Sequence, residues 1–214
     1  MVSEQPTPSR RRGISTSRLE AFSDGVFAIA ITLLVLEISV PAGSGDRLLR
    51  AVADEWPSYL AYVVSFVTIG AGWLGHSIIT EYVERADGLL IRLNLLLLMV
   101  VSFLPFPTRL LAEYIGENRP ERVAATIYGI TLFAAAALLS ALWRHAVRAG
   151  LVRADAADEE LEALTTRLSP GLASYVVLII AGLFLPIIAV IGYLFIALFL
   201  ILPFDVRRQR SRNR

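Results

Sequence analysis

The feature that most constrains this chain is the recurrence of apolar runs about as long as a membrane-spanning helix. Hydrophobic residues make up 56% of the sequence, and the runs recur along almost its whole length. A helix needs roughly 20 apolar residues to cross the hydrocarbon core of a bilayer. The sequence therefore predicts an all-α integral membrane protein that contacts a lipid bilayer along most of its length.

Six runs can each supply a membrane span. The last apolar block, 171–204, is too long for one span and barely long enough for two, so we divide it at Pro186; a single kinked helix is the alternative. We expect one transmembrane domain over 18–204 between basic cytoplasmic tails at 1–17 and 205–214. The expected spans are approximately 18–40, 56–79, 88–110, 122–145, 171–186 and 187–204.

The distribution of arginines predicts the topology. All 20 basic residues are arginine, and with six spans fifteen of them fall on one side of the membrane and five on the other. Basic residues gather on the cytoplasmic side of membrane proteins, so both termini are expected in the cytoplasm. Five spans would leave one basic tail outside. Basic tails of this kind suit a membrane protein better than a nucleic-acid-binding protein.

Several classes of chemistry are not expected. The chain has no cysteine, which excludes disulfides and thiolate chemistry. Its two histidines, His76 and His145, lie far apart in the sequence, which argues against a histidine-rich zinc site. We find no serine–histidine pair, metal cluster or phosphate loop, so we expect neither an enzyme nor a bound cofactor or metal.

Polar residues gather at one depth near the inner ends of the first three runs. Asp24 lies about two turns into the first run, where a carboxylate in a membrane is costly. Buried polar groups in lipid persist by satisfying one another, so we predict a hydrogen-bonded network that ties three helices together. A proton relay or ion site is the alternative. The residues at this depth are Arg18, Ser23, Asp24, Trp73, His76 and Asn94.

The first run has two different faces when it is drawn as a helix with 100° per residue. Asp24 lies roughly opposite Ile29, and Ser23 also lies away from it. Near Ile29 lie Phe22, Gly25 and the residues that we call the apolar stripe. Taken alone, such a stripe is typical of a helix that faces lipid or packs on a neighbour. The apolar stripe comprises Ile29, Thr32, Leu33 and Leu36.

The motif Arg18-x-x-x-Phe22-Ser23-Asp24, followed by an apolar helix, resembles the opening of the first span in the transmembrane protein 175 family. This family comprises endosomal and lysosomal potassium channels and their prokaryotic relatives. The chain contains one six-helix unit, as in the prokaryotic members, whereas the animal members carry two. Further matching positions are Trp73, His76, Asn94, Pro105 and Phe106.

The resemblance implies a potassium-selective cation leak channel, with modest selectivity over sodium, in the cell membrane of a bacterium. It implies a homotetramer in which the first helix of each subunit lines a central pore. Ile29 would then form the hydrophobic constriction, with Leu33 and Leu36 further outward and Thr32 at the position associated with potassium preference. Glu37 is a possible charge at the outer mouth.

The same resemblance implies that the polar network holds the helices together and takes no part in permeation. Phe22 belongs to it as part of the motif, beside the six residues named above. The permeant ion would be potassium, and no cofactor is implied. A proton-coupled secondary transporter that uses Asp24 and His76 is the alternative function, although no inverted repeat is evident.

Overall fold

The computed structural model describes residues 15–40, 45–157, 161–162, 164–166 and 171–202. Most of the two expected tails therefore lies outside the described residues. The described chain is almost entirely helical, with one isolated β-bridge between Val83 and Val152. The prediction of an all-α protein is confirmed.

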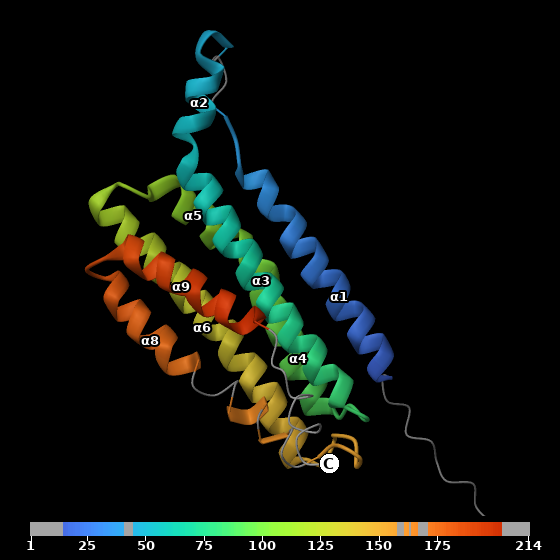
Figure 1. Cartoon of the computed structure of the whole chain (residues 1–214). Helices are drawn as coiled ribbons and strands as arrows, with labels where there is room; N and C mark the ends of the chain where they lie inside the picture. Colours follow the sequence, from blue (N-terminus) through green and yellow to red (C-terminus); the bar gives the residue numbers. More distant parts are fainter. Residues whose placement is uncertain (1–14, 41–44, 158–160, 163, 167–170, 203–214) are drawn as a thin grey trace, which may run out of the picture.

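The long helices lie side by side in a bundle, and a short helix, α2, projects from one end of it (Figure 1). Three helices have a proline at their first or second residue, where the missing N–H and the fixed φ angle suit a helix start. The elements are α1 Thr16–Leu33, the 3-10 turn η1 Leu34–Glu37, η2 Gly45–Arg47, α2 Leu48–Asp54, α3 Trp56–Tyr82, α4 Gly88–Phe103, α5 Pro105–Tyr114, α6 Asn118–Arg148, α8 Gly171–Gly182 and α9 Pro186–Ile201.

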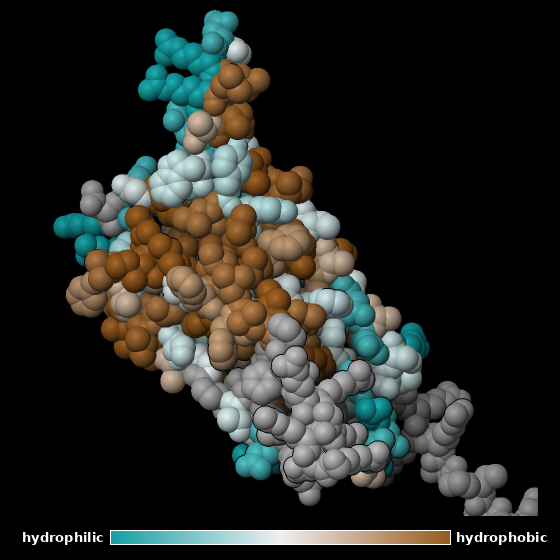
Figure 2. Space-filling view, in the orientation of Figure 1, coloured by the Kyte–Doolittle hydropathy of each residue, from teal (hydrophilic) through white to brown (hydrophobic). Residues whose placement is uncertain are grey.

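Five helical segments are long and apolar enough to cross a membrane. A sixth, α9, is apolar but has 16 residues, which at 1.5 Å per residue span about 24 Å. The last apolar block consists of two helices that pack on each other, rather than one kinked helix. Figure 2 shows hydrophobic side chains over the middle of one face and hydrophilic ones toward the α2 end, as a bilayer requires.

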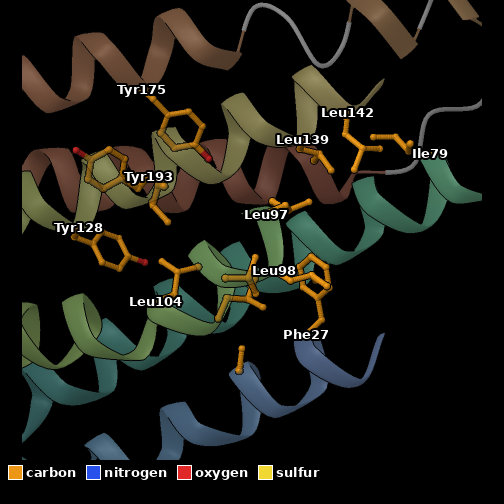
Figure 3. Packing of buried hydrophobic residues seen from close by; sticks show 14 of the residues in the cluster. Phe27, Ile79, Leu97, Leu98, Leu104, Tyr128, Leu139, Leu142, Tyr175 and Tyr193 are labelled. Atoms are coloured by element: carbon orange, nitrogen blue, oxygen red, sulfur yellow. The ribbon is translucent and has the colours of Figure 1, made fainter. Parts of the chain in front are cut away.

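The core lies between α3, α4 and α6 and is extended by α5 and α9, and α1 packs against its edge. Phe27 points from α1 into this core beside Leu98 of α4 (Figure 3). The helix α1 contacts α3 and α4, and the turn η1 contacts α3 and α5. Because every neighbour lies on one side of α1, its other side has no partner among the described residues of this chain.

Candidate functional site: the two faces of the first helix

One face of α1 is packed. Its buried residues recur every three or four positions, which is the spacing of one face of an α-helix. Four of them are apolar, and Ser23 is the polar member. This face attaches α1 to α3 and α4. The buried residues are Leu19, Ser23, Phe27, Ala30 and Leu34.

The opposite face of α1 is exposed and carries the apolar stripe. Ile29 is 60% exposed, Leu33 40% and Leu36 70%. The Thr32 hydroxyl donates a hydrogen bond to the Ile29 carbonyl at 2.9 Å, so the lone pairs of its oxygen face outward. The structure thus places all four stripe residues together on a surface that no other part of the described chain covers.

The 3-10 turn η1 changes where the end of this face points. A 3-10 helix turns by about 120° per residue, so Leu36 lies directly above Leu33 and stays in the stripe. Glu37 instead lies above the buried Leu34, on the packed side. Its Oε2 is 3.8 Å from Nε of Arg109 on α5. The structure therefore turns Glu37 toward α5 and away from the stripe.

Three fully buried side chains tie α1, α3 and α4 together near the start of α1. Ser23 Oγ donates to the Leu19 carbonyl at 2.8 Å and accepts from Asn94 Nδ2 at 3.0 Å. Asn94 Oδ1 lies 2.8 Å from His76 Nε2. Ser23 pairs with Asn94 and Asn94 with His76, which is what the membrane environment demands of buried polar groups.

Asp24 makes a second link between α1 and α3. Its Oδ1 accepts a hydrogen bond from Trp73 Nε1 at 2.9 Å, beside the packed face rather than in the stripe. Arg18 is exposed, and within the described ranges no hydrogen bond or ion pair joins it to these ties. Phe22 is 56% exposed because it lies about 100° around the helix from Ser23, on the side of the stripe. The structure thus brings five of the seven expected network residues together.

A second buried cluster was missed by the sequence analysis. Ser65 Oγ of α3 lies 2.8 Å from Thr108 Oγ1 of α5 and 2.9 Å from the Tyr128 hydroxyl of α6. Hydroxyl residues scattered through apolar helices carry no pattern that separates an interhelical bond from a bond to the helix's own backbone. The one available signal for this cluster is that Ser65 lies four residues after Ala61, a small buried residue, and so shares its face of α3.

The N-terminal end of α4 is held by a histidine on α6. Asp87 caps α4, accepting from the backbone N–H of Leu89 at 3.1 Å and of Leu90 at 2.8 Å. His145 Nε2 lies 3.0 and 2.9 Å from the two carboxylate oxygens. The Leu90 hydrogen bond, aided by His145, holds the pKa of Asp87 below its usual value.

We expect Asp87→Ala to lower stability by about 1 kcal/mol at neutral pH, the typical cost of losing a helix cap. Because the pKa of Asp87 is depressed in the folded state, its contribution is present above about pH 3.9, the unfolded value, and is lost as the pH falls through the lower folded pKa. Thermal melts in detergent at pH 7 and below pH 4 should therefore show a difference that narrows in acid. Asp46→Ala, at an exposed position in η2, is the control. Equal melting temperatures for wild type and Asp87→Ala at pH 7 would contradict the capping role.

Within the described segments, no group of three or more His, Cys, Asp or Glu side chains is placed to hold a metal ion. From Ala21 to Leu33, the buried or half-buried polar side chains of α1 are engaged with neighbouring helices, and its exposed surface is apolar apart from one hydroxyl. Such an arrangement can position a helix and present a smooth apolar surface.

Comparisons with known proteins agree with this arrangement. The model of the family described as endosomal/lysosomal potassium channel TMEM175 matches residues 18–105, which include the motif on α1 and the ties to α3 and α4. A potassium channel of Streptomyces collinus is 52% identical over 136 residues, covering 63% of this chain and 66% of the relative. A potassium channel of a Chryseobacterium species is 33% identical over 201 residues, covering 92% of this chain and 98% of the relative.

The fold matches a solved member of the same family. The crystal structure of a lysosomal potassium-selective channel TMEM175 homologue from Chamaesiphon minutus superposes with a TM-score of 0.79 at 39% identity. The match covers 86% of this chain and 95% of that one. This is a family of channels and not of enzymes. The chain belongs to the TMEM175 channel family.

Proposed function

We propose that the protein is a potassium-selective cation leak channel in which the apolar stripe of α1 lines a central pore. The observation that carries this proposal is the exposure of Ile29, Leu33 and Leu36 on the face of α1 opposite its packed face. A homotetramer would place four such faces around one axis. The names of the bacterial relatives, which are called potassium channels, support conduction of potassium.

The pore of this proposal is narrowed by side chains rather than by a filter of backbone carbonyls. Four copies of Ile29 form the constriction, and Leu33 and Leu36 continue the apolar wall for about 10 Å, at 1.5 Å per residue. Apolar rings of this kind gate by dewetting, which suits a leak channel of low open probability. Thr32 supplies the hydroxyl oxygens, whose lone pairs face away from the packed helices.

The proposal extends to the whole subunit. Residues 18–204 form a six-span unit in the cell membrane of a bacterium, and the basic tails at 1–17 and 205–214 lie in the cytoplasm. The permeant ion is potassium, and conduction needs no cofactor. The ties of Ser23 and Asp24 to α3 and α4 hold α1 so that its stripe faces the axis.

Recording from purified protein in liposomes tests this function against a proton-coupled transporter that uses Asp24 and His76. Under opposed potassium and sodium gradients, we expect currents whose reversal potential lies between zero and the potassium equilibrium potential. A slow, saturable flux that depends on a proton gradient would contradict the channel. The transporter is not favoured, because the relatives are channels and because both residues are bonded to neighbouring helices.

We expect Glu37→Gln to leave single-channel conductance at low ionic strength unchanged. Its carboxylate pairs with Arg109 on the packed side of η1, away from the proposed pore. Leu36→Glu is the positive comparison: it places a carboxylate in the stripe one residue earlier, where four copies would concentrate cations and raise conductance at low salt. A marked fall in conductance for Glu37→Gln would place Glu37 at the outer mouth instead.

A further inference from the structure

The hydrogen bonds around Asn94 run in one direction. A serine hydroxyl has one hydrogen, and Ser23 uses it on the Leu19 carbonyl at 2.8 Å. Its oxygen therefore accepts from Asn94 Nδ2, at 3.0 Å. The Asn94 carbonyl oxygen then faces His76, at 2.8 Å from Nε2. Because that oxygen only accepts, Nε2 must carry the hydrogen.

A neutral histidine carries one N–H, so Nδ1 of His76 is left as an acceptor. This atom is buried and has no hydrogen-bond partner in the described part of the chain. A protonated Nδ1 would bury an N–H donor instead, and orphaned buried donors are rarer than under-satisfied acceptors. The surroundings of Nδ1 thus call for a small hydrogen-bond donor.

A cavity of about 10 Å³ lies beside His76, at the inner end of the bundle. A site needs roughly 10–15 Å³ of such volume to hold a water molecule, so this cavity reaches the lower end of that range and has room for at most one water. Thr80 also borders it, and the Thr80 hydroxyl donates to the carbonyls of His76 at 3.2 Å and Ser77 at 3.0 Å. Its oxygen lone pairs therefore remain free to accept. The cavity lining comprises Thr16, Leu19, His76, Thr80, Val83, Leu90, Asn94 and Leu142.

We propose that this cavity is a binding site for a single buried water, which donates one hydrogen bond to Nδ1 of His76 and one to Oγ1 of Thr80. His76 is then a neutral Nε2–H tautomer, with Asn94 on one ring nitrogen and the water on the other. The histidine acts as a positioning residue for α1 and α4. This inference stands on the geometry of one subunit and does not depend on where the pore lies.

The chain has only two histidines, which makes solid-state NMR of ¹⁵N-histidine-labelled protein in lipid bilayers a direct test. We expect His76 to show a protonated Nε2, an unprotonated Nδ1, and magnetisation transfer from water protons to Nδ1. The variant His145→Gln assigns the signals by removing the other histidine. A protonated Nδ1, or no transfer from water in the wild-type protein, would overturn the proposal.

Thr80→Val tests the second contact of the water. We expect it to abolish the transfer from water to Nδ1 while Nε2 stays protonated through its bond to Asn94. The matched control is Thr126→Val on α6, where the hydroxyl likewise donates to the carbonyl four residues earlier, at 2.7 Å, but lies away from the cavity. Undiminished transfer in Thr80→Val would show that Thr80 does not hold the water.

Discussion

Replacing Ile29 by alanine or asparagine is expected to raise the potassium conductance and to reduce the selectivity for potassium over sodium. Ile29 is 60% exposed on the stripe and forms the narrowest ring in the proposed pore. Alanine widens the ring, and asparagine lets water remain in it, so both variants lower the dewetting barrier. A barrier lowered by about 1.4 kcal/mol raises the rate of passage about tenfold.

The measurement is single-channel recording in planar bilayers, with reversal potentials taken under potassium and sodium gradients. Ile180→Ala is the matched control, because Ile180 is 55% exposed on α8, a helix that does not pack against α1. We expect it to leave both quantities unchanged. If both Ile29 variants kept the wild-type conductance and reversal potential, Ile29 would not lie on the permeation path.

Replacing Asn94 by alanine is expected to cost more stability than any other single change in the polar ties. The variant leaves Ser23 Oγ without its donor and His76 Nε2 without its acceptor, inside a fully buried site. Hydrogen bonds between helices in lipid contribute about 1–2 kcal/mol each in model peptides, so the loss is about 2–4 kcal/mol. A protein with a total stability of roughly 5–15 kcal/mol would then yield much less folded material.

Size-exclusion chromatography and thermal melts of the purified protein measure this loss. Leu95→Ala is the control, since Leu95 follows Asn94 on α4 and is 48% exposed. We expect the control to elute and melt as the wild type does. A well-folded Asn94→Ala protein with the wild-type melting temperature would show that the ties do not hold α1 in place.

The sequence predicts much of this arrangement because helix periodicity is regular. The spacing of 100° per residue places Ser23 and Asp24 toward the neighbouring helices and Ile29 away from them, and the structure has the same division. Asn94 and His76 reach Ser23 because a membrane fixes the depth of each residue along its helix. Depth and angle together specify which side chains can meet.

The features that the sequence did not predict depend on local geometry or on partners distant in the chain. After Leu33 the chain changes from an α-helix to a 3-10 turn, and this change rotates Glu37 toward Arg109. The residues of the turn, Leu34–Glu37, carry no sequence signal that predicts the change. The hydrogen bond between Ser65 of α3 and Tyr128 of α6 joins residues 63 positions apart. The sequence alone does not determine how these two helices are rotated relative to each other. The helix α2 has seven residues, too few for a periodic pattern.

The most direct test of the central claim uses the absence of cysteine from the chain. Single cysteines at Leu33, Leu36 or Ile180 can each be exposed to a membrane-impermeant thiol reagent while potassium current is recorded. If the apolar stripe lines the pore, the reagent blocks current through the Leu33→Cys and Leu36→Cys channels and leaves the Ile180→Cys channel and the wild type unaffected. Unblocked current in both stripe variants, in protein shown to be folded and conducting, would contradict the claim.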